Sequence, residues 1–266
     1  MPEAWSDIRT ESCRLSREGR LLTVELDRPH AMNALHPPAS HELARVFDAF
    51  ESDPELWVAI VTGAGDRAFC AGVDLKAQAQ AGGLVETLPS GFGGLTERHD
   101  STKPVIAAVN GAALGGGFEI ALACDLVVAS ESATFALPEP RVGLAALGGG
   151  LHRLPREIGM KRAMGILLTG RHVSAREGAE LGFVNEVVPG DELMPVARAW
   201  AERILECAPL SVRATKVSSR DGLKLGSVAA AMQASYPALE RMIASEDFAE
   251  GPRAFAEKRS PVWKAR

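Results

Sequence analysis

Three short apolar runs constrain the fold of this chain more strongly than any other feature of its sequence. They are WVAIVTG, PVIAAVNG and DLVVAS, which begin at Trp57, Pro104 and Asp125. A continuous apolar run of this length, closed by a glycine or a small polar residue, is typical of a strand buried on both faces. Outside these runs, segments such as HELARVFDAFESD at residues 41–53 carry apolar residues at helical spacing. Strands that alternate with helices predict a layered α/β core.

The signals for strands are confined to the first part of the chain. RLLTVEL at residues 20–26 alternates as a further strand would, but after about Asp191 only helical patterns follow. We therefore predict an α/β core over residues 1–190, which contains the active site, and a helical C-terminal region over residues 191–266. Residues 78–94 are rich in glycine and polar residues and have no period, which predicts a mobile loop over the site.

Charge and cysteine content disfavour several classes of function. The chain of 266 residues has a formal net charge of −5 and no block of Lys or Arg, which disfavours binding to nucleic acid through phosphate neutralisation. Its four cysteines lie far apart and the N-terminus has no secretory pattern, so we expect reduced thiols and a cytoplasmic protein. No apolar run reaches transmembrane length, and no residues have metal-ligand spacing, so we expect neither a membrane partner nor a metal.

The stretch LGGGFE, residues 114–119, brings three glycines and a carboxylate to the start of a predicted helix. A helix N-terminus presents unpaired N–H groups, and glycines allow a ligand atom to approach them closely. The stretch therefore fits a site for a developing oxyanion, with Glu119 aimed into the same pocket. An alternative fits the stretch alone equally well: the glycines permit close packing of the helix on a strand, and Glu119 complements the helix dipole.

Two further motifs supply the other parts of such a site. AFCAGVDL, residues 68–75, follows a predicted strand and fits a tight turn whose N–H groups face a ligand. ATFALPEPRVG, residues 133–143, places Glu139 between two prolines that fix the backbone, although a carboxylate in a Pro-rich loop is often only a surface group. Together, two N–H groups would hold a thioester oxygen as it becomes enolate-like, while Glu119 and Glu139 would act as acid and base.

These motifs resemble the crotonase (enoyl-CoA hydratase/isomerase) superfamily over nearly the full length of the chain. The resemblance lies in LDRPHAMNAL, RAFCAGVDLK, KPVIAAVNGAALGGGFEIALACDLVVAS, FALPEPRVGL and RLPREIGMKRAMGILLTGRHVSAREGAELGFVNEVVP. GFGGLTE, FALPE and SEDFAEGPRAFAEKRSPVWKAR are most similar to the crotonobetainyl-CoA hydratases, also called carnitinyl-CoA dehydratases. The resemblance implies an α/β crotonase (ClpP-like) fold, with repeated ββα units in two roughly perpendicular sheets and a C-terminal helical region used for trimerisation.

The resemblance also implies roles for individual residues. The backbone N–H groups of Val73 and Gly116 would form the oxyanion hole. Glu119 would activate the water that attacks C3 and Glu139 would deliver the proton to C2, or the two roles would be reversed. Coenzyme A, as part of the thioester substrate and not as a permanently bound cofactor, would contact His30, Ala31, Ala71, Asp74, Leu75 and Lys76, together with Phe255 and Lys258 of a neighbouring subunit. The assembly would be a homotrimer or a dimer of trimers.

One position departs from the usual hydratase pattern. Many hydratases have a proline, then a glycine or small polar residue, before the two glycines that follow the second glutamate, whereas this chain has Ala146 and Leu147. Leu147 would narrow or dry the pocket and would remove an acidic group able to meet a cationic substrate. The leading hypothesis is hydration or dehydration of a 2,3-enoyl-CoA. The alternatives are an isomerase or hydrolase of the same fold and a non-catalytic RNA-binding member, against which the acidic balance and the glutamate pair argue.

Overall fold

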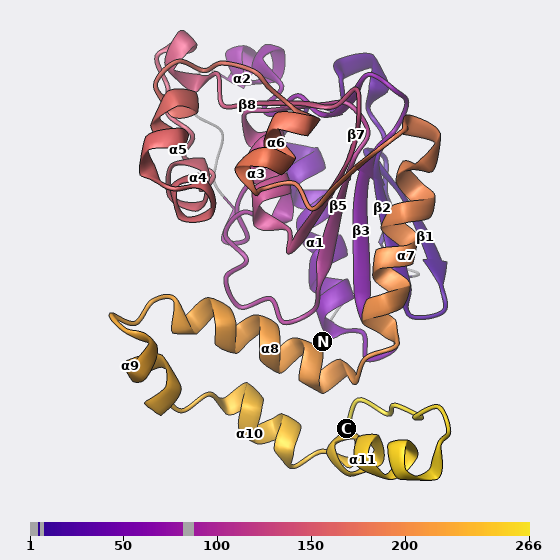
Figure 1. Ribbon diagram of the computed structural model, residues 1–266. Helices are drawn as coiled ribbons and strands as arrows, with labels where there is room; N and C mark the ends of the chain where they lie inside the picture. The colour runs from indigo at the N-terminus through magenta and orange to yellow at the C-terminus, as the bar shows by residue number, and fades with distance from the viewer. Residues whose placement is uncertain (1–4, 6–7, 82–87) are drawn as a thin grey trace.

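The computed structural model describes residue 5, residues 8–81 and residues 88–266, and Figure 1 shows their arrangement. In this part of the chain the strands form a sheet of six and a sheet of four. The large sheet has the order β1 (Cys13–Glu18), β2 (Leu21–Leu26), β3 (Val58–Gly63), β5 (Val105–Val109), β7 (Leu126–Ser130) and β10 (Glu186–Val188). The small sheet has the order β4 (Ala68–Cys70), β6 (Ala112–Leu114), β8 (Thr134–Ala136) and β9 (Val173–Ser174).

The predicted ββα units are confirmed. A strand of the large sheet leads into a strand of the small sheet and then into a helix, in the orders β3–β4–α2, β5–β6–α3 and β7–β8–α4. Figure 1 shows β8 running across the direction of β3 and β5. The helices of these units are α2 (Leu75–Ala81), α3 (Gly116–Ala123) and α4 (Gly150–Ile158). The other helices are α1 (Pro37–Ser52), α5 (Met160–Leu167), α6 (Ala175–Leu181), α7 (Leu193–Leu205), α8 (Pro209–Gly222), α9 (Val228–Gln233), α10 (Pro237–Ile243) and α11 (Glu246–Glu257).

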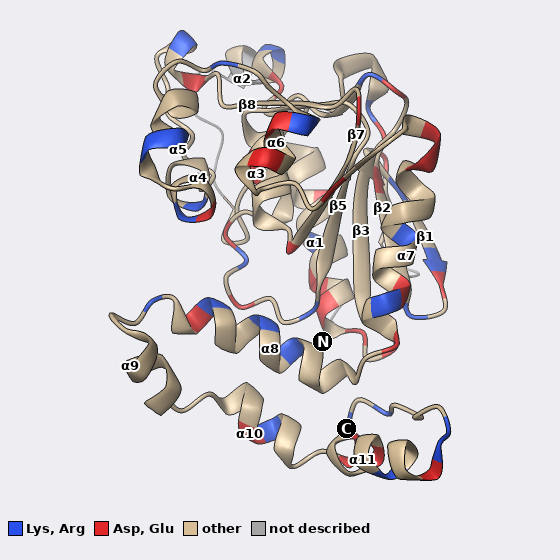
Figure 2. Ribbon diagram, in the orientation of Figure 1, with Lys and Arg blue, Asp and Glu red and all other residues tan. Residues whose placement is uncertain are grey.

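The two faces of the large sheet carry separate apolar cores. β3 and β5 are parallel, with Ile60 beside Ile106 and Val61 beside Ala107. Because successive side chains of a strand point to opposite faces, Ile60 and Ile106 pack with α7, whereas Val61 and Ala107 belong to the core that contains α1 and α3. Figure 2 shows no charged residue on β3 or β5, as burial on both faces requires.

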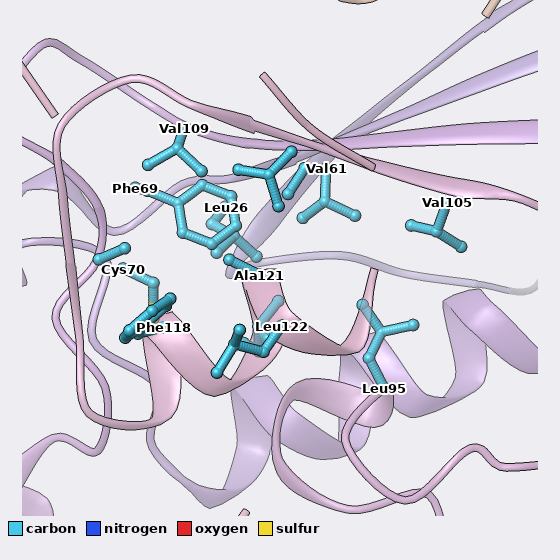
Figure 3. Close-up of a cluster of buried hydrophobic side chains, with 14 of the residues drawn as sticks. Leu26, Val61, Phe69, Cys70, Leu95, Val105, Val109, Phe118, Ala121 and Leu122 are labelled. Carbon is cyan, nitrogen blue, oxygen red and sulfur yellow. The ribbon is translucent and has the colours of Figure 1, made fainter. Parts of the chain in front are cut away.

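Helix α3 is fixed deep in the larger of these cores. Figure 3 shows Phe118 and Leu122 of this helix among side chains from β2, β3 and β5. The ring of Phe118 lies 5.1 Å from the rings of both Phe135 and Phe183, measured between centroids. This aromatic cluster holds the first turn of α3, and therefore the neighbouring Glu119, in one orientation.

The C-terminal region consists of helices, as the sequence predicts. Helix α7 packs on the large sheet, and Figure 1 shows α8 to α11 continuing beside the core as an extended helical layer. Helix α8 is tied to the core because Lys216 donates to the carbonyl oxygen of Lys103 and to Asp125, both at 2.8 Å, and Arg220 donates to the carbonyl oxygen of Ser101 at 3.0 Å. The division of the chain at residue 190 stays a prediction.

The structure confirms the longer strands and corrects the predicted loop. The apolar runs correspond to β2, β3, β5 and β7, whereas the short strands of the small sheet carried too few residues to show a period. Helix α1 begins at Pro37, ahead of the predicted His41, because His36 caps it by accepting the Ala39 N–H at 3.3 Å. The loop predicted over residues 78–94 is wrong at both ends: α2 extends to residue 81 and residues 92–94 form a 3₁₀ turn, η2 (Phe92–Gly94). Residues 82–87 lie outside the described residues.

Candidate active site

The glycine run of residues 115–117 forms the start of α3. Each of the three glycines has a different structural role there. Gly115 has a φ of +53°, a left-handed conformation that favours glycine, and its N–H donates to the carbonyl oxygen of Ala136 at 2.9 Å. A Cβ on Gly117 would lie 1.9 Å from the carbonyl oxygen of Cys70, so only glycine permits this close approach of α3 to β4. Gly116 lies between them in the first turn, where an α-helix leaves its N–H groups without an internal partner.

Val73 lies in the turn between β4 and α2, where it forms a single parallel bridge with Leu35. The neighbours of Val73 make the hydrogen bonds of this bridge: Leu35 N–H donates to the carbonyl oxygen of Gly72 at 2.8 Å, and Asp74 N–H donates to that of Leu35 at 3.0 Å. The N–H of Val73 itself therefore points away from Leu35. A Cβ on Gly72 would lie 3.0 Å from the nitrogen of Gly116, so this turn lies against the start of α3. The two predicted oxyanion donors thus lie on neighbouring segments.

Glu119 is the buried carboxylate of this region. Only 4% of its surface is exposed, and its Oε1 accepts the N–H of Gly150 at 2.9 Å. A Cβ on Gly148 would lie 2.5 Å from its Oε2, so the turn before α4 closes over the carboxylate with no room for a side chain. Burial raises the pKa of Glu119 to about 7; the Gly150 N–H and the Arg153 charge act in the opposite direction, and the Glu139 charge adds to the rise.

Glu139 approaches the start of α3 from the first residue of η3 (Glu139–Val142). A Cβ on Gly115 would lie 3.1 Å from Oε1 of Glu139, which places this carboxylate beside the glycine run. Its Oε2 is buried and has no hydrogen-bond partner among the described residues. Burial raises the pKa of Glu139 as well. Because a buried oxygen without a partner is costly, this atom marks a position where a ligand or a reacting water would be bound.

The raised pKa of Glu119 predicts a cost in stability that depends on pH. Unfolding returns the group to its ordinary value of 4.5, so the folded protein loses stability as the pH rises from 4.5 to about 7, with no further loss above that. Glu119→Gln removes this ionisation and therefore its cost. We expect the difference in free energy of unfolding between Glu119→Gln and wild type to be about 2–3 kcal/mol larger, in favour of the variant, at pH 8 than at pH 5. Urea unfolding at both pH values and one protein concentration measures the difference, with Glu180→Gln on the exposed surface of α6 as control. An equal effect at the two pH values would contradict a raised pKa.

The residues predicted to contact coenzyme A lie on two segments that run side by side. The N–H of Ala71 donates to the carbonyl oxygen of Met32 at 3.0 Å, which joins the turn after β4 to the segment that follows β2. His30 and Ala31 lie in the 3₁₀ turn of this second segment, η1 (Pro29–Ala31), with His30 exposed. The structure therefore brings His30, Ala31 and Ala71 to one edge of the molecule, close along the chain to Val73, the predicted oxyanion donor.

Asp74, Leu75 and Lys76 continue this edge into α2. The carboxylate of Asp74 accepts the Ala77 N–H at 3.2 Å and pairs with Arg28 at 3.2 Å. Although burial acts in the opposite direction, these two partners lower the pKa of Asp74. Asp74 therefore fixes the turn that carries Val73, whereas Leu75 and Lys76 are exposed and open to a ligand.

Leu147, Phe255 and Lys258 lie apart from this cluster in the single chain. Phe255 is 88% exposed in α11, and Lys258 follows as its C-cap. Figure 1 shows α11 at the far end of the helical layer, away from α2 and α3. Leu147 lies in the turn over Glu119 but is 68% exposed. The contact of Phe255 and Lys258 with coenzyme A of a neighbouring subunit stays a prediction.

The sequence pattern placed Leu147 and the following glycines near the pocket, but it did not predict that this turn covers Glu119 or which residues hold the turn. The three glycines of residues 148–150 precede a helix, as those of residues 115–117 do, and this repetition was the available signal. Arg153 follows on α4, and its guanidinium donates to the carbonyl oxygens of Gly148 and Thr96. Phe92 lies against the glycine run, because a Cβ on Gly116 would be 2.5 Å from its ring. Neither Arg153 nor Phe92 stands in a pattern that indicates such a position.

Comparison with known proteins identifies the family. A profile described as enoyl-CoA hydratase/isomerase matches residues 16–266. The chain belongs to the enoyl-CoA hydratase/isomerase family. This family member is 46% identical to the carnitinyl-CoA dehydratase of Proteus mirabilis and 44% identical to that of Salmonella typhi, and each alignment covers 97% of this chain and 100% of the relative.

Crystal structures of other members of the enoyl-CoA hydratase/isomerase family have the same fold. An enoyl-CoA hydratase from Mycobacterium tuberculosis is 41% identical with a TM-score of 0.90, over 96% of this chain and 99% of that one. An enoyl-CoA hydratase from Bacillus anthracis is 35% identical with a TM-score of 0.88, over 96% of this chain and 100% of that one. The predicted crotonase fold is thus confirmed.

Three further features concern the described part of this family member. No group of three or more His, Cys, Asp or Glu side chains there could hold a metal ion. Among the same residues, no helix is both long and apolar enough to cross a membrane. Cys70, close to the turn that carries Val73, is fully buried, and burial raises the pKa of its thiol to about 12, so it is a core residue and not a nucleophile.

Proposed function

We propose that the protein is a hydratase/dehydratase, which adds water across the 2,3-double bond of an enoyl-CoA thioester and removes it in the reverse direction. The observation that carries this proposal is the pair of carboxylates at the start of α3, buried Glu119 and Glu139 with its unpartnered Oε2. Burial raises the pKa of Glu119 to about 7, so this carboxyl can take up or release a proton near neutral pH, and burial raises the pKa of Glu139 as well. Membership of the family and the names of the relatives support the same reaction.

The N–H groups of Val73 and Gly116 would bind the thioester oxygen. As water adds at C3, electron density moves to this oxygen and the thioester becomes enolate-like. Donors that are fixed before the reaction stabilise such a charge, and loss of one donor costs about 3 kcal/mol of transition-state stabilisation in a comparable oxyanion hole. Gly116 also places the oxygen at the N-terminus of α3, whose partial positive charge adds to the stabilisation.

The two carboxylates would move the protons. Ionised Glu119 would take a proton from the water whose oxygen forms the new bond to C3. Protonated Glu139 would give its proton to C2, where the electron pair of the enolate forms the C2–H bond. One water is consumed, and the proton passes from Glu119 back to Glu139 through solvent before the next turnover. Exchange of the two roles gives the same net reaction.

Coenzyme A would lie along the edge formed by the segments that follow β2 and β4. Its contacts would be made by His30, Ala31, Ala71, Asp74, Leu75 and Lys76, with Phe255 and Lys258 supplied by another subunit. Lys76 and Lys258 are exposed and would meet phosphate as point charges.

The exposed apolar side chains of the helical layer support a homo-oligomer, a homotrimer or a dimer of trimers. Leu223, Val228 and Met232, at and after the end of α8, are at least three-quarters exposed in the single chain. Large apolar side chains exposed on this layer favour a surface that another chain covers. We further propose that the assembly is cytoplasmic, as the spaced thiols favour.

The relatives named carnitinyl-CoA dehydratase favour crotonobetainyl-CoA as the acyl substrate, and carnitinyl-CoA in the reverse direction. To test the reaction, purified protein is mixed with crotonyl-CoA and with crotonobetainyl-CoA, and loss of the enoyl chromophore is measured with water addition confirmed by mass spectrometry. We expect hydration of at least one substrate, and the preferred one defines the acyl group. Binding of both thioesters without hydration would reject the reaction and favour an isomerase or hydrolase of the same fold, with Leu147 the first residue to replace.

A further inference from the structure

Arg153 connects the turn over Glu119 with the loop beside Gly116. The chemistry described above does not use this residue. It lies on α4, is half-buried, and closely follows the turn formed by residues 148–150. Its Nη1 donates to the carbonyl oxygen of Gly148 at 3.3 Å, and its Nη2 donates to the carbonyl oxygen of Thr96 at 2.6 Å. The guanidinium is thus held between the turn that covers Glu119 and the loop that contains η2.

On one side, the guanidinium holds the turn that contacts Glu119. A Cβ on Gly149 would lie 1.9 Å from Nη1 of Arg153, and Gly149 has a φ of +105°, so glycine both leaves space for the guanidinium and adopts the turn. Because the carbonyl group of Gly148 points toward Arg153, the turn presents the N–H of Gly150 to Oε1 of Glu119. Loss of the guanidinium would release this turn from the carboxylate that it orients.

On the other side, the guanidinium holds the loop that packs on the oxyanion donor. The N–H of Phe92 donates to Oγ1 of Thr96 at 2.8 Å, so the position of Thr96 fixes that of Phe92. The ring of Phe92 lies on the Cα of Gly116, where a Cβ would be only 2.5 Å from the ring. Through Thr96 and Phe92, Arg153 therefore helps to fix the position of Gly116, whose N–H is proposed to bind the thioester oxygen.

We propose that Arg153 is a positioning residue for the hydration reaction, which holds the acid–base group Glu119 in a fixed position relative to the oxyanion donor Gly116. The inference rests on the proposed function. The guanidinium acts through the turn and the loop, and its charge also acts on Glu119. The charged groups that face Glu119 are Glu139 from η3 and Arg153 from α4. The groups that face Arg153 are Glu97, Glu119, Glu157 and the thiol of Cys124.

The test compares Arg153→Met with Arg156→Met, which removes an exposed arginine from the same helix. We expect Arg153→Met to lower kcat for hydration by about ten- to a hundredfold, as for lost hydrogen bonds of a charged group, with KM changed by about threefold or less. The limb of the pH profile that Glu119 controls should move to higher pH, because the positive charge no longer favours the carboxylate. Arg156→Met should change neither kcat nor the pH profile.

A conservative variant separates positioning from folding. Arg153→Lys keeps the charge but cannot reach two carbonyl groups with one planar fork, so we expect the pH limb to return toward that of wild type while kcat stays reduced. Circular dichroism and thioester binding give the folded fraction, and Arg153→Lys carries the test if Arg153→Met does not fold. An unmoved pH limb, or a loss of kcat that only follows the folded fraction, would overturn the proposal. Retained hydration in Glu119→Gln and Glu139→Gln would instead reject the proposed function itself.

Discussion

Replacement of either Glu119 or Glu139 by glutamine is expected to lower kcat for hydration by about 10²- to 10⁴-fold, the usual contribution of a positioned acid or base. Glutamine keeps the shape of the side chain, and at position 119 its carbonyl oxygen can still accept the N–H of Gly150. What it removes is the ability to take or give a proton. The measurement is the steady-state hydration rate of the preferred enoyl-CoA, together with the affinity of each variant for the product thioester, which should change little.

Two controls make this result specific. Glu180→Gln, on the exposed surface of α6, removes a carboxylate far along the chain from the pair and should leave kcat unchanged. The double variant of Glu119 and Glu139 should lose far less than the product of the two single losses, because both groups serve one step. A single variant that keeps more than about a tenth of the wild-type rate would show that its carboxylate is neither acid nor base. One dispensable glutamate would favour the isomerase or hydrolase alternative.

The sequence predicted the long strands because they have two buried faces. Ile60 and Ile106 face one core and Val61 and Ala107 face the other, so a run with no charged residue is the pattern that such strands require. The small sheet had no comparable signal. Its strand β9 has only two residues, too few for any period, and depends on its pairing with β8. The predicted loop at residues 78–94 is partly wrong because a high glycine content does not exclude ordered structure: Gly93 and Gly94 form the buried turn η2.

At the site, the sequence pointed to residues that act through the backbone or carry the carboxylates, but not to those that hold them in place. Gly116 and Glu119 stand in a motif from which the proposed oxyanion and acid–base roles were predicted. The contact of Arg153 with Gly148 and Thr96 joins positions far apart in the chain, and such contacts leave no periodic trace in one sequence. For the glycine run, the structure supports the alternative of close helix packing, whereas binding of an oxyanion stays a proposal. Gly117 permits helix packing, whereas Gly116 leaves its N–H at the start of the helix.

Replacement of Gly117 by alanine is expected to destabilise the protein by about 3 kcal/mol or more, at the upper end of overpacking effects. The added Cβ would lie 1.9 Å from the carbonyl oxygen of Cys70 and 2.7 Å from its carbonyl carbon. These are backbone atoms of β4, so no change of side-chain rotamer relieves the clash, and α3 must move away from the sheet. The measurements are the thermal midpoint and the guanidinium midpoint, both at one protein concentration because the proposed homo-oligomer would contribute to them.

Gly165→Ala provides the matched control for this prediction. Gly165 lies within α5, and a Cβ there would meet nothing within 4 Å. The same substitution in an open helical position should stabilise the protein by about 0.5–1 kcal/mol, because alanine has the higher helix propensity. The two variants therefore differ in the sign of their effect although the chemical change is identical. If Gly117→Ala were as stable as wild type, α3 would not lie so close to β4, and the N–H of Gly116 would lose the fixed position from which it is proposed to bind the thioester oxygen.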